Sequence, residues 1–152
     1  MDEAQRRILA EVTRLVTSRQ QPVAALTQAA ALLQRLPHYT GVYFYELRGE
    51  TLVLVAHAGR DTEHTHIPVG EGICGLSART REAVIVEDVK SDPRYLACNL
   101  ETESEIVVPI MSGATYLAQI DIDSDHKAAF GPGDRAFLEG VAALVRPLFP
   151  TA

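Results

Sequence analysis

Cysteine is scarce in this 152-residue chain, which contains only Cys74 and Cys98. Two cysteines cannot build a disulfide scaffold, and in a reducing compartment such a pair is more often two free thiols or a redox couple than a structural disulfide. Neither a CxxC pair nor a closely spaced set of cysteines and histidines occurs, so a structural zinc site is not expected. We predict that the protein uses neither a metal nor a cofactor.

Long apolar runs and basic clusters are also missing. Polar or charged residues interrupt every apolar stretch well before the roughly 18 residues of a membrane span, and the N-terminal MDEAQRR lacks the apolar core of a signal peptide. The formal net charge is −6, and no Lys/Arg-rich block offsets it. We therefore expect a cytoplasmic protein without nucleic-acid or membrane partners.

The composition is that of an ordinary globular protein, with 47% hydrophobic and 22% charged residues. A chain of this length buries roughly two-thirds of its unfolded surface. No internal repeat, low-complexity tract or interdomain linker divides it. We predict a single domain over residues 1–152.

Three stretches have the apolar periodicity of amphipathic helices: Glu3–Arg19, Val23–Leu36 and Phe137–Leu148. Pro22 suits the first turn of the second helix, and Asp134 is expected to cap the last one. Each helix has one apolar face that must be covered by a sheet or by other helices.

The middle of the chain is rich in β-branched and aromatic residues, which is typical of strands. Two hairpins are predicted, Gly41–Leu47 with Thr51–Ala58 and Glu105–Met111 with Thr115–Ile122, and a further strand at Ala83–Val89. Hairpins at both ends of the strand set imply a largely antiparallel sheet with the long helices on one face. The predicted fold is therefore α+β, with a loop-roofed pocket on the other face.

The glycine-rich stretch IPVGEGICG (Ile67–Gly75) is not a phosphate loop, because neither Gly-Lys-Ser/Thr nor GxGxxG occurs. Its glycines are expected to turn the chain sharply into a short helix, Leu76–Arg81, beside Cys74. Further on, Asp92 and Pro93 predict a single helical turn that carries Cys98.

Three carboxylates lie on the strands that follow Cys98. Asp121 and Asp123 are spaced i, i+2, so both leave the strand on one face, and their repulsion favours a retained proton on one of them. A simpler interpretation has Asp121 ending the strand and Asp123 capping the next turn. Glu105 is equally consistent with a solvated edge position.

Other notable residues have simple structural interpretations as well. Cys74, between glycine and apolar neighbours, can be a small buried hydrophobe. Tyr39 and Tyr43 can be core or rim aromatics. His64 and His66 are expected to be exposed loop histidines.

These residues together resemble the GAF domain family, and more narrowly its branch that reduces free methionine-(R)-sulfoxide. Cys98 placed seven residues before Glu105, together with Cys74 in GICG, is the most specific part of the resemblance. The matching segments are IPVGEGICG, VEDV, LAC (Leu96–Cys98), SEIVVPI (Ser104–Ile110) and IDIDS (Ile120–Ser124).

The resemblance implies a role for each candidate. Cys98 would be the nucleophile that attacks the sulfoxide sulfur and becomes a sulfenic acid. The substrate, free methionine sulfoxide, would be bound by Tyr39, Tyr43, Glu105, Asp121 and Asp123, with the carboxylates holding its ammonium group and assisting proton delivery. Thioredoxin or a small thiol would be the reductant, and a homodimer through the terminal helices is expected.

The chain departs from the family pattern at several positions. His64 stands where the family commonly has its resolving cysteine, which leaves Cys74 or an external thiol to clear the sulfenic acid. Tyr39 replaces a tryptophan, and Ala118-Gln119 replaces a Gly-Val pair.

Two other functions therefore stay open. One is a non-catalytic GAF sensor that binds a small polar ligand. The other is a thiol redox sensor in which Cys74 pairs with Cys98.

Overall fold

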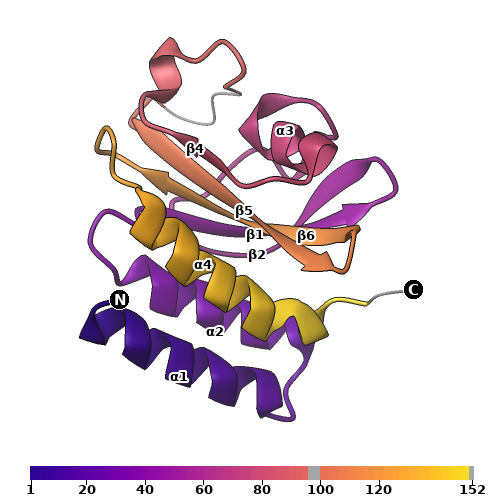
Figure 1. Cartoon of the computed structure of the whole chain (residues 1–152). Coiled ribbons are helices and arrows are strands. Elements are labelled where there is room, and N and C mark those ends of the chain that lie inside the picture. The colour runs from indigo at the N-terminus through magenta and orange to yellow at the C-terminus, as the bar shows by residue number, and fades with distance from the viewer. Residues whose placement is uncertain (96–99, 151–152) are drawn as a thin grey trace.

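The computed structural model describes residues 1–95 and 100–150, which form a six-stranded sheet with a helical layer on one face and a shorter helix with loops on the other (Figure 1). The strand order is β3-β2-β1-β6-β5-β4, and every neighbouring pair is antiparallel. The strands are β1 (Gly41–Arg48), β2 (Thr51–Gly59), β3 (His66–Pro68), β4 (Val84–Val86), β5 (Ser104–Ser112) and β6 (Thr115–Ser124). The helices are α1 (Glu3–Thr17), α2 (Pro22–Gln34), α3 (Gly72–Thr80) and α4 (Pro132–Val145), with 3₁₀ turns η1 (Val89–Ser91) and η2 (Arg146–Leu148). The predicted fold class and both hairpins are confirmed.

The helical layer is built from the three predicted amphipathic helices. α2 packs on β1 and β2, α4 packs on β5, and α1 lies across α2 and α4 farther from the sheet. α1 begins with a reciprocal cap between Asp2 and Gln5, and Pro22 occupies the first turn of α2. Asp134 lies inside the first turn of α4, where its carboxylate accepts the Gly131 backbone N–H at 2.9 Å. No helix in the described part of the chain has the length and apolar character needed to cross a bilayer.

The alternation along β6 divides the sheet into two chemically different faces. Ala118, Ile120 and Ile122 lie in the large apolar core beneath the helical layer. The intervening residues of β6 point to the opposite face. They are Gln119, Asp121 and Asp123, and all three are buried.

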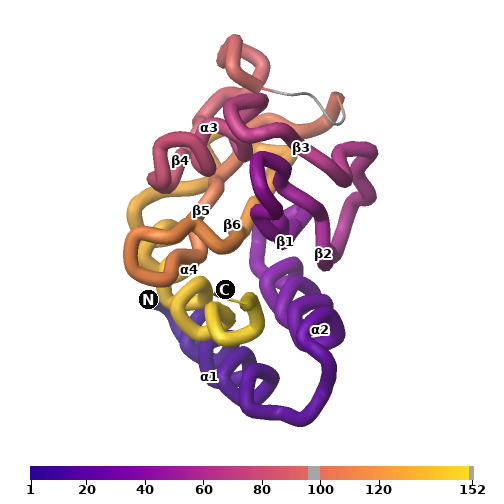
Figure 2. The backbone as a smooth tube through the Cα atoms, turned by 90° about the vertical axis from the view of Figure 1, so that its right-hand side faces the viewer, coloured from indigo at the N-terminus to yellow at the C-terminus, as the bar shows by residue number. Residues whose placement is uncertain are grey.

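The opposite face is covered by α3 and by the loops around it (Figure 2). Gly70 and Gly72 have φ angles of 93° and 64°, a left-handed conformation that glycine adopts without strain. The expected sharp turn into a short helix is therefore present. α3 starts four residues earlier than predicted, so Cys74 lies within its first turn.

Two predictions near the candidate cysteine were wrong in part. The strand expected at Ala83–Val89 is limited to β4, and the 3₁₀ turn η1 follows it. Residues 93–94 form a turn and not a helix, because the Asp92 side chain accepts the backbone N–H of Arg94 at 2.9 Å and bends the chain locally. Residues 96–98, the end of the predicted helical turn with Cys98, lie outside the described residues.

Candidate functional site

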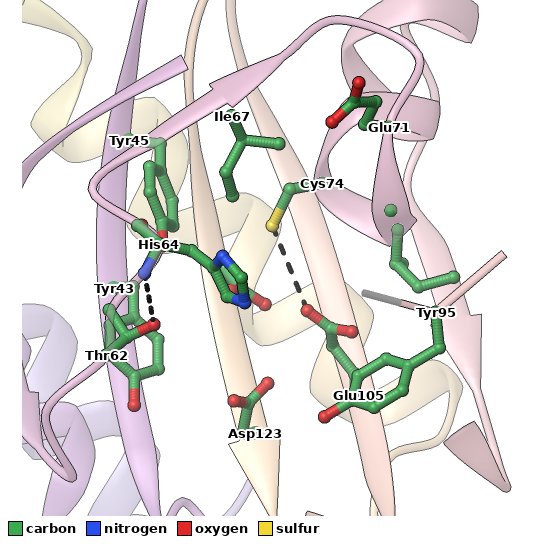
Figure 3. Close-up of a pocket in the computed structure, with 13 residues that line it drawn as sticks. Tyr43, Tyr45, Thr62, His64, Ile67, Glu71, Cys74, Tyr95, Glu105 and Asp123 are labelled. Atoms are coloured by element: carbon green, nitrogen blue, oxygen red, sulfur yellow. Dashed lines mark hydrogen bonds between the residues drawn. The ribbon is translucent and has the colours of Figure 1, made fainter. Parts of the chain in front are cut away.

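A narrow cavity lies between the sheet and the covering of α3 and loops (Figure 3). The atom-free space within it and at its opening to solvent amounts to about 370 Å³. Its floor comes from β1, β5 and β6, and its covering comes from α3, the 60–65 loop and Tyr95. The residues of the sequence-based prediction that line it are Tyr43, Cys74, Glu105, Asp121 and Asp123.

The three carboxylates converge because β5 and β6 are paired in a fixed register. Glu105 lies directly opposite Asp123, and Asp121 follows two residues along the same face. Their side chains are buried, with only 5%, 4% and 5% of the residue surface exposed for Glu105, Asp123 and Asp121. The interpretation of Glu105 as a solvated edge residue is therefore wrong. The two aspartates line a cavity and do not merely end a strand.

Burial governs the ionisation of this cluster. It raises the pKa of Asp121, although hydrogen bonds with Glu105 and Cys74 act in the opposite direction. The Asp121 Oδ1 atom is buried and accepts no hydrogen bond from the described residues. A ligand that brings N–H or O–H donors would satisfy it.

Cys74 is a buried thiol at the carboxylate cluster. Its Sγ donates to Glu105 Oε2 across 3.9 Å. Burial raises the pKa of Cys74 well above its usual value, and the negative charges of Asp121 and Glu105 raise it further. Cys74 is therefore held as a thiol, which is a poor nucleophile. Gln119, one of the family departures, reaches from β6 toward the Cys74 carbonyl at 3.5 Å.

Cys74, Glu105 and Asp121 also offer three ligand atoms that lie within 4.8 Å of one another. A divalent ion at this place would need the thiolate form of Cys74. The surroundings that raise the pKa of Cys74 oppose that form. A ligand with an ammonium group requires no such deprotonation, so the cluster suits an organic cation better than a metal.

Two tyrosines of β1 anchor the loop that covers the cavity. The hydroxyl of Tyr43 donates to the carbonyl of Arg60 at 2.5 Å, and that of Tyr45 donates to the carbonyl of His64 at 2.7 Å. Tyr45 was missed by the sequence reasoning. Its i, i+2 spacing from Tyr43 on a predicted strand was a signal that could have found it.

The structure does not bring Tyr39 to the cavity. Its ring packs edge-to-face on Phe130, with centroids 5.6 Å apart, and its hydroxyl donates to Asp134 at 2.7 Å. Tyr39 precedes β1 and follows His38, whose φ is 70°. Because the chain is not extended there, the alternation that directs Tyr43 into the cavity does not continue back to Tyr39.

His64 is also placed differently from its prediction. His66 is exposed as expected, but His64 is half-buried and lines the cavity. In Figure 3 its ring points into the space between Cys74 and Asp123. The polar composition of residues 59–66 gives both histidines the same expectation, although His66 begins β3 and His64 lies in the loop before it.

Cys98 itself lies outside the described residues. Tyr95, three positions before it in the sequence, lines the cavity. The neighbouring Arg94 forms an ion pair with Asp92 at 2.6 Å.

The fold and the site define the class of protein. The GAF domain family matches residues 1–147, and the chain belongs to that family. Within it, the chain is 41% identical over 110 residues to the free methionine-R-sulfoxide reductase of Saccharomyces cerevisiae, a match that covers 71% of this chain and 61% of the yeast protein.

Two solved structures are similar over most of their length. One is the type II free methionine-R-sulfoxide reductase of Thermoplasma acidophilum, with 41% identity and a TM-score of 0.81 over 84% of this chain and 91% of that one. The other is the free methionine-R-sulfoxide reductase of Neisseria meningitidis in complex with its substrate, with 32% identity and a TM-score of 0.89 over 97% and 90% of the two chains.

Proposed function

We propose that this protein, acting as one GAF domain over residues 1–152, reduces free methionine-(R)-sulfoxide to methionine with Cys98 as the nucleophile. The observation that carries the proposal is the group of three buried carboxylates, Glu105, Asp121 and Asp123, that converge in one cavity. Similarity to several free methionine-R-sulfoxide reductases supports the same activity.

The carboxylates are suited to a ligand that carries a positive charge. Buried carboxylates are costly unless they are paired, and the ammonium of a free amino acid supplies both charge and N–H donors. A methionine inside a peptide has no ammonium group. The cluster therefore favours the free amino acid over an internal methionine.

Cys98 is close enough in the sequence to serve the cavity. It follows the cavity-lining residue Tyr95 by three positions, and three residues span at most about 11 Å when fully extended. Its thiolate attacks the sulfoxide sulfur, two electrons pass to that sulfur, and the oxygen is transferred to Cys98 as a sulfenic acid. A carboxyl group whose pKa is raised, as at Asp121, can supply the proton that the oxygen needs.

A thiol must then remove the sulfenic acid. The raised pKa of Cys74 disfavours it as an internal resolving residue, because attack requires a thiolate. We therefore propose an external reductant, either thioredoxin or a small thiol. The first thiol displaces water and forms a mixed disulfide, and a second thiol releases Cys98, so two thiols yield one disulfide and one water.

The test is consumption of stereochemically pure free methionine-(R)-sulfoxide with dithiothreitol as reductant. Wild-type protein and Cys74→Ser should turn over, and Cys98→Ser should not. Loss of thioredoxin-driven activity in Cys74→Ser, with dithiothreitol-driven activity retained, would show that Cys74 is the resolving residue. Absence of turnover by the wild type with every thiol reductant, together with tight binding of another small molecule, would indicate a GAF sensor instead.

The expected homodimer through the terminal helices stays a prediction. Sedimentation velocity at micromolar concentration should give the mass of two chains. A monomer at all accessible concentrations would contradict it.

A further inference from the structure

The charges around the cavity are strongly unbalanced. Among the described lining residues, four carry carboxylates and His64 is the one side chain that can carry a positive charge. The acids Glu105, Asp121 and Asp123 lie on the strands of the floor, while His64 enters from the covering loop. The fourth acid, Glu71, is exposed at the start of α3, so a ligand between the floor and the loop meets three acids on one side and an imidazole on the other.

His64 is held at this position by its backbone. The carbonyl of His64 accepts the hydroxyl of Tyr45 at 2.7 Å, and its backbone N–H donates to Thr62 Oγ1 at 3.1 Å. Tyr45 is itself 2% exposed and lies on a central strand. The loop is thus fixed to the sheet at the residue that carries the imidazole, and Figure 3 shows that ring pointing into the cavity.

We propose that His64 is a specificity-determining residue that donates a hydrogen bond to the α-carboxylate of the ligand, while the floor carboxylates hold its ammonium. This inference rests on the proposed function and extends it. The carboxylate cluster alone accepts any ligand with an ammonium group, including the N-terminal residue of a peptide. Recognition of the α-carboxylate by His64 rejects that residue, since its carboxyl group is in an amide bond.

The inference is tested with two substrates that differ only at the carboxyl group, free methionine-(R)-sulfoxide and its α-carboxamide. Wild-type protein should prefer the free acid. In His64→Ala, the KM for the acid should rise about tenfold to a hundredfold, the usual range for loss of a charge-assisted hydrogen bond. The KM for the carboxamide should stay within about twofold, so that the discrimination between the two substrates collapses.

Two further variants make the result specific. His66→Ala removes an exposed histidine two residues away and should keep the wild-type preference. His64→Asn retains a side-chain N–H donor and should recover part of the lost affinity for the acid. If His64→Ala fails to fold, His64→Asn still tests the inference.

An unchanged acid-to-carboxamide ratio in folded His64 variants would overturn the inference and leave the proposed reductase activity intact. A fall in kcat for both substrates at constant KM would also overturn it, because it would assign His64 to proton transfer. Absence of binding and turnover of either substrate by the wild type would overturn the proposed function together with the inference.

Discussion

The two faces of β6 are both buried, yet they have opposite chemistry. Toward the helical layer, Ala118, Ile120 and Ile122 are fully buried among apolar side chains. Toward the cavity, Asp121 and Asp123 are nearly as inaccessible but present carboxylates to one another and to β5. Burial by itself therefore does not distinguish the two faces.

The difference shows how the protein separates stability from function. The helix-covered face gains free energy from apolar burial, about 25 cal/mol per Å². The cavity face loses free energy, because a carboxylate removed from water must be protonated, hydrogen-bonded or paired with a ligand. Substitutions on the first face should act on folding, and those on the second should act mainly on the ligand.

The largest effect is expected from placing a carboxylate, as found on the cavity face, on the face that packs against the helices. Ile120→Asp puts an unpaired carboxylate into the apolar core and should lower the free energy of unfolding by about 4 kcal/mol or more. Urea denaturation followed by circular dichroism measures it. A loss below about 1 kcal/mol would show that the helical face tolerates charge and that the contrast between the faces is unfounded.

Removing a carboxylate from the cavity face should weaken substrate binding and have little effect on stability. Asp123→Ala deletes one charge that faces the ammonium of the proposed substrate, so the KM for free methionine-(R)-sulfoxide should rise about tenfold to a hundredfold. The free energy of unfolding should change little or increase. Steady-state kinetics and urea denaturation on the same preparation check both, and unchanged KM would exclude Asp123 from binding.

The buried Asp121 on the cavity face should make the stability of the protein depend on pH. Because burial raises the pKa of folded Asp121, the folded state binds this proton more tightly than the unfolded state, whose pKa is about 3.9. The stabilisation is fully present below pH of about 3.9 and is lost as the pH rises through the folded pKa, with a slope of at most about 1.4 kcal/mol per pH unit.

Asp121→Asn cannot titrate, so the difference in unfolding free energy between wild type and variant isolates this proton. Relative to the variant, wild-type stability should increase as the pH falls from 7 toward 4. The comparison is needed because Asp125 has the opposite behaviour: its hydrogen bond with Arg60 lowers its pKa. A pH-independent difference would mean that Asp121 is not perturbed.

The smallest effects are expected from removing the hydroxyl group of Tyr39 or of Tyr45. Tyr39→Phe loses the hydroxyl that donates to Asp134 and should lower the free energy of unfolding by about 1 kcal/mol, with KM unchanged. Tyr45→Phe frees the carbonyl of His64 and should raise KM a fewfold. If Tyr39→Phe changed KM instead, the family-based assignment of Tyr39 to the substrate site would be restored.

Much of the fold could be predicted because periodicity is a local property. Apolar spacing identified α1, α2 and α4, and β-branched runs between turn residues identified both hairpins. The i, i+2 spacing of Asp121 and Asp123 correctly predicted that they share a face. The family resemblance added Glu105 and Tyr43, which the structure brings to the same cavity.

Other parts of the site could not be predicted from local patterns. The turn after Asp92 depends on a side-chain hydrogen bond that competes with regular structure. The spacing of Tyr45 from Tyr43 places both on one strand face, but only the tertiary structure shows that the Tyr45 hydroxyl holds the loop at His64. Cys98, the proposed nucleophile, is identified by sequence alone.

The sequence by itself determined the succession of helices and strands, the alternation of apolar and acidic residues along β6, and the family, because these depend on residue order. Only the tertiary structure decided that both faces of β6 are buried, that Tyr39 packs against Phe130 in the apolar core, and that His64 faces the carboxylates. These outcomes depend on contacts between segments distant in the chain, such as Tyr45 with the loop at His64, which no local pattern encodes.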